Sequence, residues 1–295
     1  MIASQILMIR PVRFGYNAET AVNNTFQQNG GENAQDGALK EFDAFVALLE
    51  AHDIAVTVFD DTPAPHTPDA IFPNNWISFH PGGIACLYPM FAGNRRQERK
   101  ALNAIKNTFA IRRCIDFTHY ETRGLFLEGT GSMVFDRRRQ IAYACLSPRT
   151  DEEALYDFCR QMHFSPVLFH ATDANGQAVY HTNVMLCVAE DFAVVCLESI
   201  TDKREQAALV NTLTETGKEI VPITFAQMAA FAGNMLQLQN RSGKRFLILS
   251  DTARHALTPA QTGALEKYNG LLSPAVPTIE RNGGGSVRCM MAEVF

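Results

Sequence analysis

The sequence Gly283-Gly-Gly-Ser-Val-Arg-Cys289-Met-Met-Ala-Glu-Val-Phe295 combines a glycine loop, a cysteine and an apolar tail. Three glycines allow positive φ angles and a close approach of the backbone to a ligand. Terminal segments fray unless a sheet holds them, so the apolar tail predicts a core strand. Cys289 is then either a thiol aimed by the loop or an inert buried side chain, which is the usual state of a cysteine in apolar surroundings.

Four upstream segments repeat one order of elements: a strand, a tight turn, an antiparallel strand, a helix and a last strand. In the first segment the turn Pro81-Gly-Gly83 separates two apolar runs, which is typical of a hairpin. The following helix has Leu102, Ile105 and Phe109 on one face. In each unit the expected elements are, in order, two strands, a helix and a third strand. Unit by unit they are 69–79, 84–88, 96–109 and 111–115; 132–135, 141–146, a helix with the capping box Thr150 and Glu153, and 166–169; 182–188, 192–197, 202–215 and 219–223; 234–238, 245–249, 259–268 and 274–279.

A fifth unit forms only if the two ends of the chain meet. The strand 288–295 would pair with 5–12, and the helix 38–52 and the strand 54–59 would complete the unit. Units that each expose an apolar face cover it by stacking around an axis. The sequence therefore predicts an α/β fold in which residues 1–295 form one domain, a five-bladed, pseudo-symmetric β/α propeller of ββαβ units closed by pairing of the N- and C-terminal strands. A plain α/β sandwich with hairpins is the alternative.

Composition excludes several classes of protein. The 295 residues are 46% hydrophobic and 19% charged, with a net charge of -5, as in an ordinary globular enzyme. Lysines and arginines are spread along the chain, so nucleic acid is not an expected partner. The apolar runs are far shorter than the ~20 residues of a membrane span, and no signal peptide is recognisable, so no membrane contact and a cytoplasmic location are expected. A homo-oligomer stays open.

The cysteines argue against disulfides and metal sites. Their number, seven, is odd, no CxxC motif occurs, and no histidine pair has ligand spacing. Four of them lie in apolar, strand-like runs and are expected to be small core hydrophobes, namely Cys86, Cys145, Cys187 and Cys196. Cys289 differs because glycines precede it.

In a closed ring the starts of the hairpins meet at one axis, although they are ~50 residues apart in sequence. Polar or nucleophilic side chains occupy these starts, including Asn74, Asn75, Glu128, His181, Asn183, Asn234 and Cys289. A cysteine and a histidine are the minimum for nucleophilic catalysis, because the thiolate attacks and the imidazole moves protons. The alternatives are that Glu128 caps a turn and that His181 is a core histidine with satisfied hydrogen bonds.

Four motifs follow one another between residues 128 and 289, within the repeated ββαβ units that extend along nearly the whole chain: the glutamate-glycine pair at Glu128, Ser147-Pro-Arg-Thr150, His181 before a strand, and Gly283-Gly-Gly before Cys289. Together they resemble the arginine deiminase and amidinotransferase superfamily, whose fold is called pentein. The branch called citrulline-utilisation hydrolases, often labelled amidinotransferases, is similar in three further stretches, which are Met8-Ile-Arg-Pro11, Asn17-Ala-Glu-Thr20 and Phe72-Pro-Asn-Asn-Trp76.

The resemblance implies a catalytic role for three residues. Cys289 would be the nucleophile that attacks a guanidino or ureido carbon, and His181 would protonate the departing nitrogen and then activate water. Glu128 would hold the terminal nitrogens of the substrate. No metal or organic cofactor is implied, and the expected partner is a small-molecule substrate, an amino acid with a guanidino or ureido group.

The resemblance also implies substrate-binding residues. Arg149 matches an arginine that binds the substrate carboxylate, and Arg95 matches a second one, although Arg96 is adjacent. Asp69 resembles a residue that dimethylarginine hydrolases place near the amino-acid end of the substrate. From the residues alone, Arg149 is either a solvated charge beside a helix or a fork for a carboxylate. The other expected substrate-binding residues are Asn75, Asn183 and Asn234.

Two departures from the superfamily change the expected substrate. Where arginine and agmatine deiminases have an aspartate against the guanidinium, this chain has Asn75, and His181-Thr-Asn183 replaces a His-x-Asp motif. Removing one buried carboxylate partner of a cation commonly costs about 3–5 kcal/mol. An amide side chain offers a donor and an acceptor, which suits a neutral ureido group. Citrulline or a similar ureido amino acid is therefore favoured over arginine, although dimethylarginine hydrolases also lack the second aspartate.

The expected function is a cysteine hydrolase of a non-peptide C–N bond that acts through a covalent carbamoyl- or amidino-thiol. Three alternatives use the same chain: an arginine deiminase or dimethylarginine-type hydrolase, an amidinotransferase in which a second amine outcompetes water, and a non-catalytic pentein binding module. The segment 13–36 is rich in Asn, Gln and Gly and is either a lid over the site or a surface loop without a role.

Overall fold

The structure is a computed structural model that describes residues 1–31 and 34–295, and this described part contains five three-stranded sheets. In each sheet a central strand has one antiparallel and one parallel neighbour. The first sheet joins the two ends of the chain, because β1 (Gln5–Arg10) pairs with β15 (Ala292–Val294) and with β2 (Ala55–Asp60). The other sheets are β3 (Ile77–His80), β4 (Ile84–Leu87) and β5 (Arg113–Asp116); β6 (Val134–Asp136), β7 (Ile141–Leu146) and β8 (Ser165–His170); β9 (Leu186–Val188), β10 (Phe192–Val195) and β11 (Glu219–Pro222); and β12 (Leu236–Gln239), β13 (Arg245–Ile248) and β14 (Gly270–Leu272).

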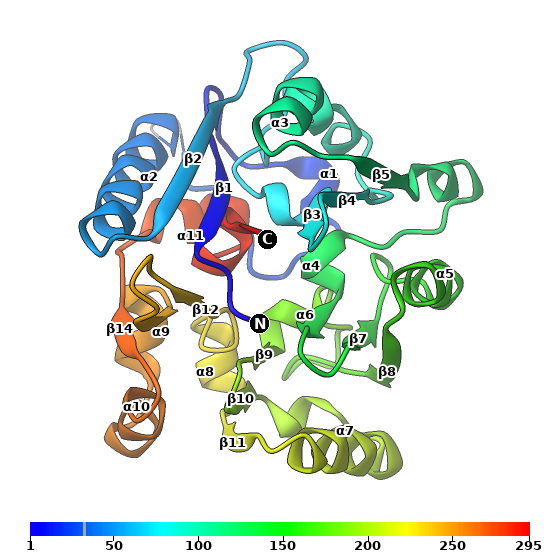
Figure 1. Ribbon diagram of the computed structural model, residues 1–295, viewed down its shortest axis with the longest axis vertical. Coiled ribbons are helices and arrows are strands. Elements are labelled where there is room, and N and C mark those ends of the chain that lie inside the picture. Colours follow the sequence, from blue (N-terminus) through cyan, green and yellow to red (C-terminus); the bar gives the residue numbers. More distant parts are fainter. Residues whose placement is uncertain (32–33) are drawn as a thin grey trace.

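A helix lies on the outer side of each sheet (Figure 1). These helices are α2 (Ala34–Ala51), α3 (Leu102–Thr108), α5 (Glu152–Met162), α7 (Lys203–Glu215) and α10 (Pro259–Glu266). In α2, Phe42, Phe45 and Leu49 recur on one face and are fully buried. The apolar period of the sequence therefore packs this helix onto the molecule, as predicted. The fold is mixed α/β and is built from repeated ββαβ units.

Short helical turns precede four of the inner strands, and the sequence prediction misses them. They are η1 (Pro73–Asn75), α4 (Gly129–Ser132), α6 (Thr182–Met185) and η5 (Val287–Met290). The predicted strands 69–79, 182–188 and 288–295 are therefore wrong at their starts. Pro73 lacks the N–H of a ladder bond and fits the first position of a helical turn. The turns at α6 and η5 are buried on every side, so no apolar alternation reveals them.

Three further local predictions are wrong. The segment predicted as strand 274–279 contains the start of α11 (Pro277–Gly283), because Pro277 occupies the first turn of a helix, and β14 is the third strand of that sheet. The cap of α5 is Asp151 rather than Thr150, since the Asp151 carboxylate accepts the N–H groups of Glu153 and Ala154. The predicted helix 96–109 is divided into a 3₁₀ segment, η2 (Arg95–Ala101), and α3.

The remaining short helices lie in the connections between these elements. They are α1 (Ala18–Ala21), α8 (Phe225–Ala229), α9 (Asp251–Ala256), η3 (Thr118–Arg123) and η4 (Leu197–Ser199). None of the helices in the described residues is long and apolar enough to cross a membrane.

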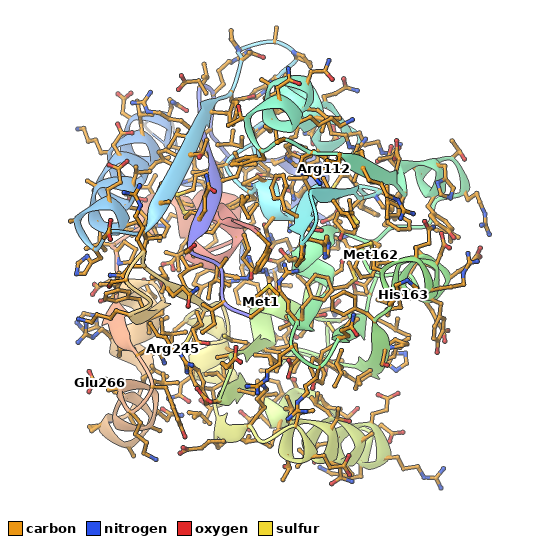
Figure 2. All side chains as sticks on the ribbon, in the orientation of Figure 1. Met1, Arg112, Met162, His163, Arg245 and Glu266 are labelled. Atoms are coloured by element: carbon orange, nitrogen blue, oxygen red, sulfur yellow. The ribbon has the colours of Figure 1, made fainter. Side chains whose placement is uncertain are left out.

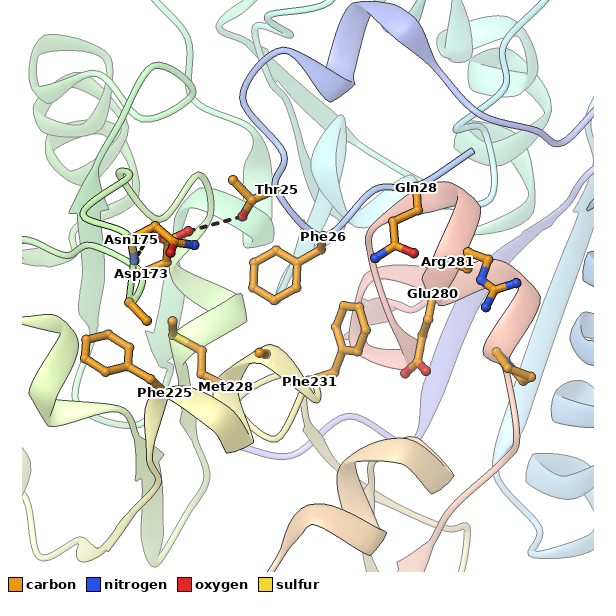
Figure 3. A pocket seen from close by; sticks show the side chains of 13 residues that line it. Thr25, Phe26, Gln28, Asp173, Asn175, Phe225, Met228, Phe231, Glu280 and Arg281 are labelled. Carbon is orange, nitrogen blue, oxygen red and sulfur yellow. Dashed lines mark hydrogen bonds between the residues drawn. The ribbon is translucent and has the colours of Figure 1, made fainter. Parts of the chain in front are cut away.

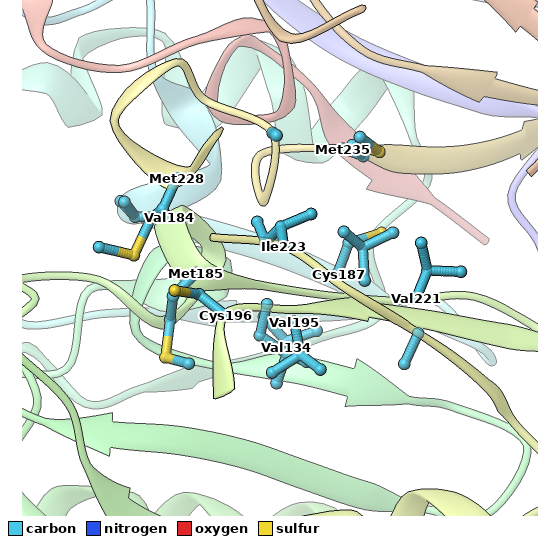
Figure 4. Packing of buried hydrophobic residues seen from close by; sticks show 14 of the residues in the cluster. Val134, Val184, Met185, Cys187, Val195, Cys196, Val221, Ile223, Met228 and Met235 are labelled. Carbon is cyan, nitrogen blue, oxygen red and sulfur yellow. The ribbon is translucent and has the colours of Figure 1, made fainter. Parts of the chain in front are cut away.

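Apolar side chains fill the space between the sheets and their helices. In the cluster of Figure 4, Val195 and Val221 come from neighbouring strands, and Met228 and Met235 belong to the same cluster. The four predicted core cysteines are buried. Burial raises the pKa of Cys86, Cys145 and Cys187 to about 12 and that of Cys196 to about 11. These four thiols are protonated at neutral pH, as expected of inert core residues.

Side chains project from the elements in the middle of the molecule as well as from the outer helices (Figure 2). The short turns η1, α4, α6 and η5 contact one another there in three pairs, η1 with α4, α4 with α6, and η1 with η5. Residues from four distant parts of the sequence are therefore neighbours, and most of the predicted site residues lie on or beside these turns.

Candidate active site

Cys289 lies in η5, and its side chain is 4% exposed. Helix α11 ends at Gly283, and Gly284 adopts a left-handed φ of 61° that turns the chain toward η5. A Cβ atom at Gly284 would lie 2.6 Å from Nδ2 of Asn24, so a larger residue does not fit this turn. The glycine loop therefore acts as a tight connection between α11 and Cys289.

His181 and Glu128 form a direct pair beside this cysteine. His181 immediately precedes α6 and Glu128 immediately precedes α4, and Nε2 of His181 lies 2.7 Å from Oε2 of Glu128. The other carboxylate oxygen accepts the N–H of Phe91 at 2.9 Å. Both side chains are at most 2% exposed. The backbone and the histidine thus hold both oxygens of the carboxylate.

The electrostatics of the pair determine its protonation. Burial alone raises the pKa of Glu128, but Arg149, the hydrogen bond from His181 and Arg95 outweigh it and lower this pKa to about 2. Burial lowers the pKa of His181 to about 4, although Glu128 opposes the shift. At neutral pH Glu128 is therefore an anion and His181 is neutral. Because Nε2 carries the proton that Glu128 accepts, Nδ1 of His181 has a free lone pair and is available as a base.

This protonation state predicts the pH dependence of any reaction that needs His181 as a base. The neutral form is fully populated above the lowered pKa and disappears as the pH falls through about 4. As the pH is lowered, we expect kcat/KM to stay constant through 6.5, the ordinary pKa of histidine, and to decline only near pH 4. A pH–rate profile with stability controls checks this, and an acid limb centred on 6.5 would contradict it.

Arg149 reaches the Glu128 carboxylate and the N-terminal segment at the same time. Its Nη1 lies 3.6 Å from Oε2 of Glu128. Its Nε and Nη2 groups donate to Oδ1 of Asn23, and Nη2 also donates to the carbonyl of Thr20 at 2.7 Å. The guanidinium lies over the ring of Tyr180, 4.9 Å from its centroid. The predicted carboxylate fork is thus buried in the site and is held by neutral acceptors on residues 20–23.

Arg95 has a partner that the sequence prediction misses. Its Nε and Nη2 donate to the two oxygens of Glu98 at 2.7 and 3.0 Å, and its Nη1 donates to Oδ1 of Asn75 at 2.8 Å. Burial raises the pKa of Glu98 to about 7, although Arg95 opposes the shift. The signal was the spacing, since residues three apart share one side of a helical turn. Arg95 therefore holds Asn75 in place as well as facing the cavity.

Asp69 is buried at the edge of the same cluster. Its Oδ2 accepts from Nδ2 of Asn17 at 2.8 Å and from Oγ1 of Thr20 at 3.1 Å, and it lies 3.9 Å from Nε of Arg95. Burial raises the pKa of this carboxyl, and Arg95 acts against the rise. Among the described residues, Oδ1 of Asp69 has no hydrogen-bond partner. An acceptor is therefore available here for a donor on a ligand.

Asn183 and Asn234, predicted to bind substrate, both contact the candidate nucleophile. Nδ2 of each donates toward Sγ of Cys289 at 3.4 Å. Asn183 belongs to α6, two residues after His181, and Asn234 lies before β12. Both asparagines are almost fully buried.

These side chains line a narrow cavity whose volume is about 10 Å³. Its lining combines the predicted residues with others from the N-terminal segment and the glycine loop: Thr20, Asn24, Asp69, Phe72, Asn75, Arg95, Arg149, Tyr180, His181, Gly283, Gly285 and Cys289. Small-molecule sites usually have about 300–1,000 Å³. An amino acid therefore fits only if part of the lining moves.

The N-terminal segment covers this cavity. Asn17, Thr20 and Asn24 are buried, and Nδ2 of Asn24 donates to the carbonyl of Gly284 at 3.3 Å. Of the segment 13–36, expected to be either a lid or a surface loop, Glu32 and Asn33 lie outside the described residues. The contacts with Arg149, Asp69 and Gly284 place residues 17–24 of the segment at the site.

A larger cleft, of about 410 Å³, lies beyond the N-terminal segment (Figure 3). Phe26 lines this cleft and packs against Phe231 and against Tyr180, and Tyr180 also lines the active-site cavity. Its lining has neither the cysteine nor the histidine of the site. The candidate nucleophile and base both line the small cavity. In residues 1–31 and 34–295 no group of three or more His, Cys, Asp or Glu side chains could hold a metal ion.

Comparison with known proteins identifies the family. The family model for N,N dimethylarginine dimethylhydrolase, eukaryotic, matches residues 10–295. No curated protein matches the sequence significantly.

Solved structures share the fold at low sequence identity. ArgZ, an arginine dihydrolase from the ornithine-ammonia cycle in cyanobacteria, has 15% identity and a TM-score of 0.77 in its apo form, with 98% of this chain and 40% of ArgZ covered. A variant of AgrE with L-arginine has 15% identity and a TM-score of 0.79, with 100% of this chain and 40% of AgrE covered. A dimethylarginine dimethylaminohydrolase adduct has 14% identity and a TM-score of 0.69, with 99% of this chain and 100% of the other covered. This chain thus spans about 40% of the length of ArgZ and AgrE.

The family model covers the chain from residue 10 to its last residue, and the fold agrees with it. The superfamily that the motifs predicted is therefore confirmed. The chain belongs to the eukaryotic N,N dimethylarginine dimethylhydrolase family, within the pentein-fold arginine deiminase and amidinotransferase superfamily.

Proposed function

We propose that the protein is a cysteine hydrolase of a non-peptide C–N bond in a ureido or guanidino amino acid. The observation that carries this proposal is the presence of Cys289 and the Glu128-bound His181 at one cavity. A thiol, a neutral imidazole base and a carboxylate that orients the imidazole are the set required for nucleophilic catalysis. Family membership supports the same class of reaction, since its relatives include a dimethylarginine dimethylaminohydrolase and an arginine dihydrolase.

We also propose that residues 1–295 form one five-bladed, pseudo-symmetric pentein domain. Five sheets of the same strand pattern and the pairing of β1 with β15 support this arrangement. In such a ring the starts of the inner strands face one axis, which accounts for the meeting of Glu128, His181 and Cys289 from different units.

In the first chemical step, the sulfur of Cys289 attacks the ureido or guanidino carbon. The thiol proton passes to Nδ1 of His181 and the S–C bond forms. One electron pair of the C=O bond of a ureido group, or of the C=N bond of a guanidino group, moves onto the oxygen or nitrogen. When this adduct collapses, a C–N bond breaks, and the departing nitrogen takes the proton from His181. A carbamoyl- or amidino-thiol remains on Cys289. Glu128 orients His181 and stabilises its protonated form.

In the second step, water releases the intermediate. Water gives a proton to Nδ1 of His181 and its oxygen attacks the same carbon. The C–S bond then breaks with its electron pair on sulfur, and the proton returns from His181 to Cys289. If the first step released the amino-acid amine of a ureido substrate, the second step yields carbamic acid, which decomposes to ammonia and carbon dioxide.

The charges of the cavity suit the amino-acid end of a substrate. Arg149 is held by a carbonyl and an amide oxygen on residues 20 and 23, and a substrate carboxylate would be a stronger, charged partner. Asp69 offers its unshared Oδ1 to an ammonium group. Binding of a free amino acid would therefore exchange contacts of the N-terminal segment for contacts with the ligand.

Asn75 supports a ureido substrate. Its Oδ1 already accepts from Arg95, and an arginine can only donate, so the orientation of the amide is fixed. Its Nδ2 group is buried and has no partner in the described part of the chain. A Cβ atom at Gly131 would lie 2.4 Å from this Nδ2 and 2.7 Å from Nδ1 of His181, so both nitrogens approach one point. A donor there suits the oxygen of a ureido group, especially as negative charge develops on it.

A guanidino substrate is the second candidate, and unpartnered hydrogen-bond acceptors in the site support it. Oδ1 of Asp69 and Oδ1 of Asn183 have no partner among residues 1–31 and 34–295, and Glu128 is anionic. A guanidinium carries only donors, so it would use these acceptors but would leave Nδ2 of Asn75 facing a donor. The two candidates therefore differ in what they require of Asn75.

A substrate panel tests the proposed function. The purified chain is assayed with citrulline, arginine, agmatine, dimethylarginine and N-acylated arginines, and ammonia, citrulline, ornithine and urea are measured separately. We expect ornithine and ammonia from citrulline. Citrulline and ammonia from arginine, with no turnover of citrulline, would support the guanidino reaction instead. No turnover of any ureido or guanidino compound would contradict the proposed function.

Asn75→Asp should shift the preference of the site toward a cation. The aspartate keeps an oxygen for Arg95 and replaces the unpartnered Nδ2 with a charged acceptor. Because charge-assisted pairs are roughly twice as strong as neutral ones, we expect kcat/KM for arginine relative to citrulline to rise about tenfold or more. Asn211→Asp, on the exposed side of α7, is the matched control. An unchanged ratio would show that Asn75 does not discriminate between these substrates.

A further inference from the structure

We propose that Asn183 and Asn234 are catalytic residues that orient and activate the sulfur of Cys289, and that they do not serve mainly to bind substrate. The inference rests on the proposed function, because it assigns the nucleophile of that reaction. It changes the role that sequence patterns suggest for both asparagines.

The geometry of Asn234 is determined by the protein itself. Its Oδ1 accepts the backbone N–H of Arg288 at 3.1 Å, and its Nδ2 donates to the carbonyl of Asn183 at 3.1 Å. With one end of the amide fixed as an acceptor, the remaining N–H of Nδ2 faces Sγ of Cys289 at 3.4 Å. Asn234 thus binds the backbone just before the cysteine and the sulfur of the cysteine at once.

Asn183 supplies a second donor to the same atom. Its Nδ2 lies 3.4 Å from Sγ, and its Oδ1 is unpartnered within the described residues. Two N–H groups that converge on a sulfur favour the thiolate, because hydrogen bonds to a charged form stabilise that form. The free Oδ1 is then available to a nitrogen of the substrate at the point of attack.

The backbone is built to bring these two amides together. A Cβ atom at Gly233 would lie 2.2 Å from the carbonyl oxygen of Val184, so only glycine allows the loop before β12 to approach α6 this closely. Gly233 precedes Asn234, and Val184 follows Asn183. The close approach therefore sets both asparagines on one side of Cys289.

The other polar groups around Cys289 are engaged elsewhere and do not stabilise charge on its sulfur. His181 is neutral and gives its Nε2–H to Glu128, so it places no positive charge beside the sulfur before substrate binds. Arg95 and Arg149 are occupied by Glu98 and by residues 20–23. Tyr180 donates its hydroxyl to the carbonyl of Gly284 at 2.6 Å. Orientation of the sulfur, and stabilisation of its charge as the proton leaves, are therefore assigned to Asn183 and Asn234.

The test measures the reactivity of the sulfur without any substrate. Full-length wild type, Asn234→Ala and Asn183→Ala are treated with iodoacetamide at about pH 7, and the modification of Cys289 is followed by peptide mapping. We expect each variant to react about tenfold more slowly than the wild type, because each loses one hydrogen bond to the sulfur. Asn211→Ala, an exposed residue of α7, is the control and should react like the wild type.

Two further measurements, of folding and of steady-state kinetics, separate an effect on the sulfur from an effect on the fold or on substrate binding. Asn183→Ala removes a side chain whose Oδ1 has no described partner, so we expect it to retain the fold even if Asn234→Ala does not, and circular dichroism checks this. With an active substrate, kcat should fall and KM should change less than about twofold. Wild-type alkylation rates in both folded variants, or a rise in KM with unchanged kcat, would overturn the inference. Slower alkylation in an enzyme that hydrolyses none of the panel would uphold it and reject the proposed function.

Discussion

Cys289→Ser is expected to lower kcat by about 10⁴-fold or more while leaving the fold intact. Serine replaces one atom of a side chain that is 4% exposed, and its hydroxyl accepts the amide donors of Asn183 and Asn234 as the sulfur does. A hydroxyl is a far weaker nucleophile than a thiolate at neutral pH, so no covalent intermediate should form. The measurement is steady-state turnover of whichever compound of the substrate panel is active.

The control for this variant is Cys159→Ser. Cys159 is buried in α5, and burial raises the pKa of its thiol to about 12. Its replacement should leave kcat unchanged, which separates loss of the nucleophile from general damage to the core. Full activity of Cys289→Ser would refute the role of the cysteine, whatever the substrate proves to be.

Deleting residues 292–295 should unfold most of the protein at ambient temperature. The deletion removes β15, which pairs with β1, and it removes Glu293, which lies 3.3 Å from the guanidinium groups of both Arg137 and Arg288. Loss of one partner from a buried ion pair costs about 3–5 kcal/mol. Together with the lost strand, this approaches the total of about 5–15 kcal/mol that stabilises a typical domain.

The measurement is the midpoint of thermal unfolding by circular dichroism. Deleting Phe295 alone is the matched control, because it removes the ring that lies 4.2 Å from the Arg137 guanidinium and keeps β15. That contact contributes about 0.5–2 kcal/mol, so the control should melt only a few degrees lower. Equal stability of the two deletions would show that the pairing of β15 with β1 is not essential to the fold.

The order of elements could be predicted because each unit has local signals. The helix α2 has a clear apolar face, and the turn at Gly82 and Gly83 uses two left-handed glycines, with φ of 85° and 72°. Pairing of β1 with β15 was predictable from the apolar character of both ends. These features depend on residues close together in sequence or on the need to cover an apolar surface.

The short turns at the centre could not be predicted in the same way. Residues 182–185 are apolar enough for a strand, but they form α6 because they are packed on all sides by α4, β7 and β9. Periodicity identifies a helix with one wet and one dry face, and a fully buried turn has no such contrast. Only the long-range packing decides its conformation.

The sequence predicted which residues gather at the site better than it predicted the contacts between them. Glu128, His181 and Cys289 lie together, but Asn183 and Asn234 contact the sulfur, and Arg95 pairs with Glu98. Motif resemblance identifies which residues gather at a site. Which atom of an asparagine faces the cavity depends on partners far away in sequence, such as Arg95 for Asn75.

Detection of the covalent intermediate would establish directly that Cys289 is the nucleophile. Wild-type protein is mixed with citrulline, quenched with acid at a series of times during turnover, and mapped by peptide mass spectrometry, with arginine as a parallel substrate. Covalent catalysis by Cys289 predicts a carbamoyl or amidino group on this residue during turnover, its disappearance when substrate is exhausted, and its absence in Cys289→Ser. Turnover with Cys289 unmodified at every quench time, and equally fast in Cys289→Ser, would contradict it.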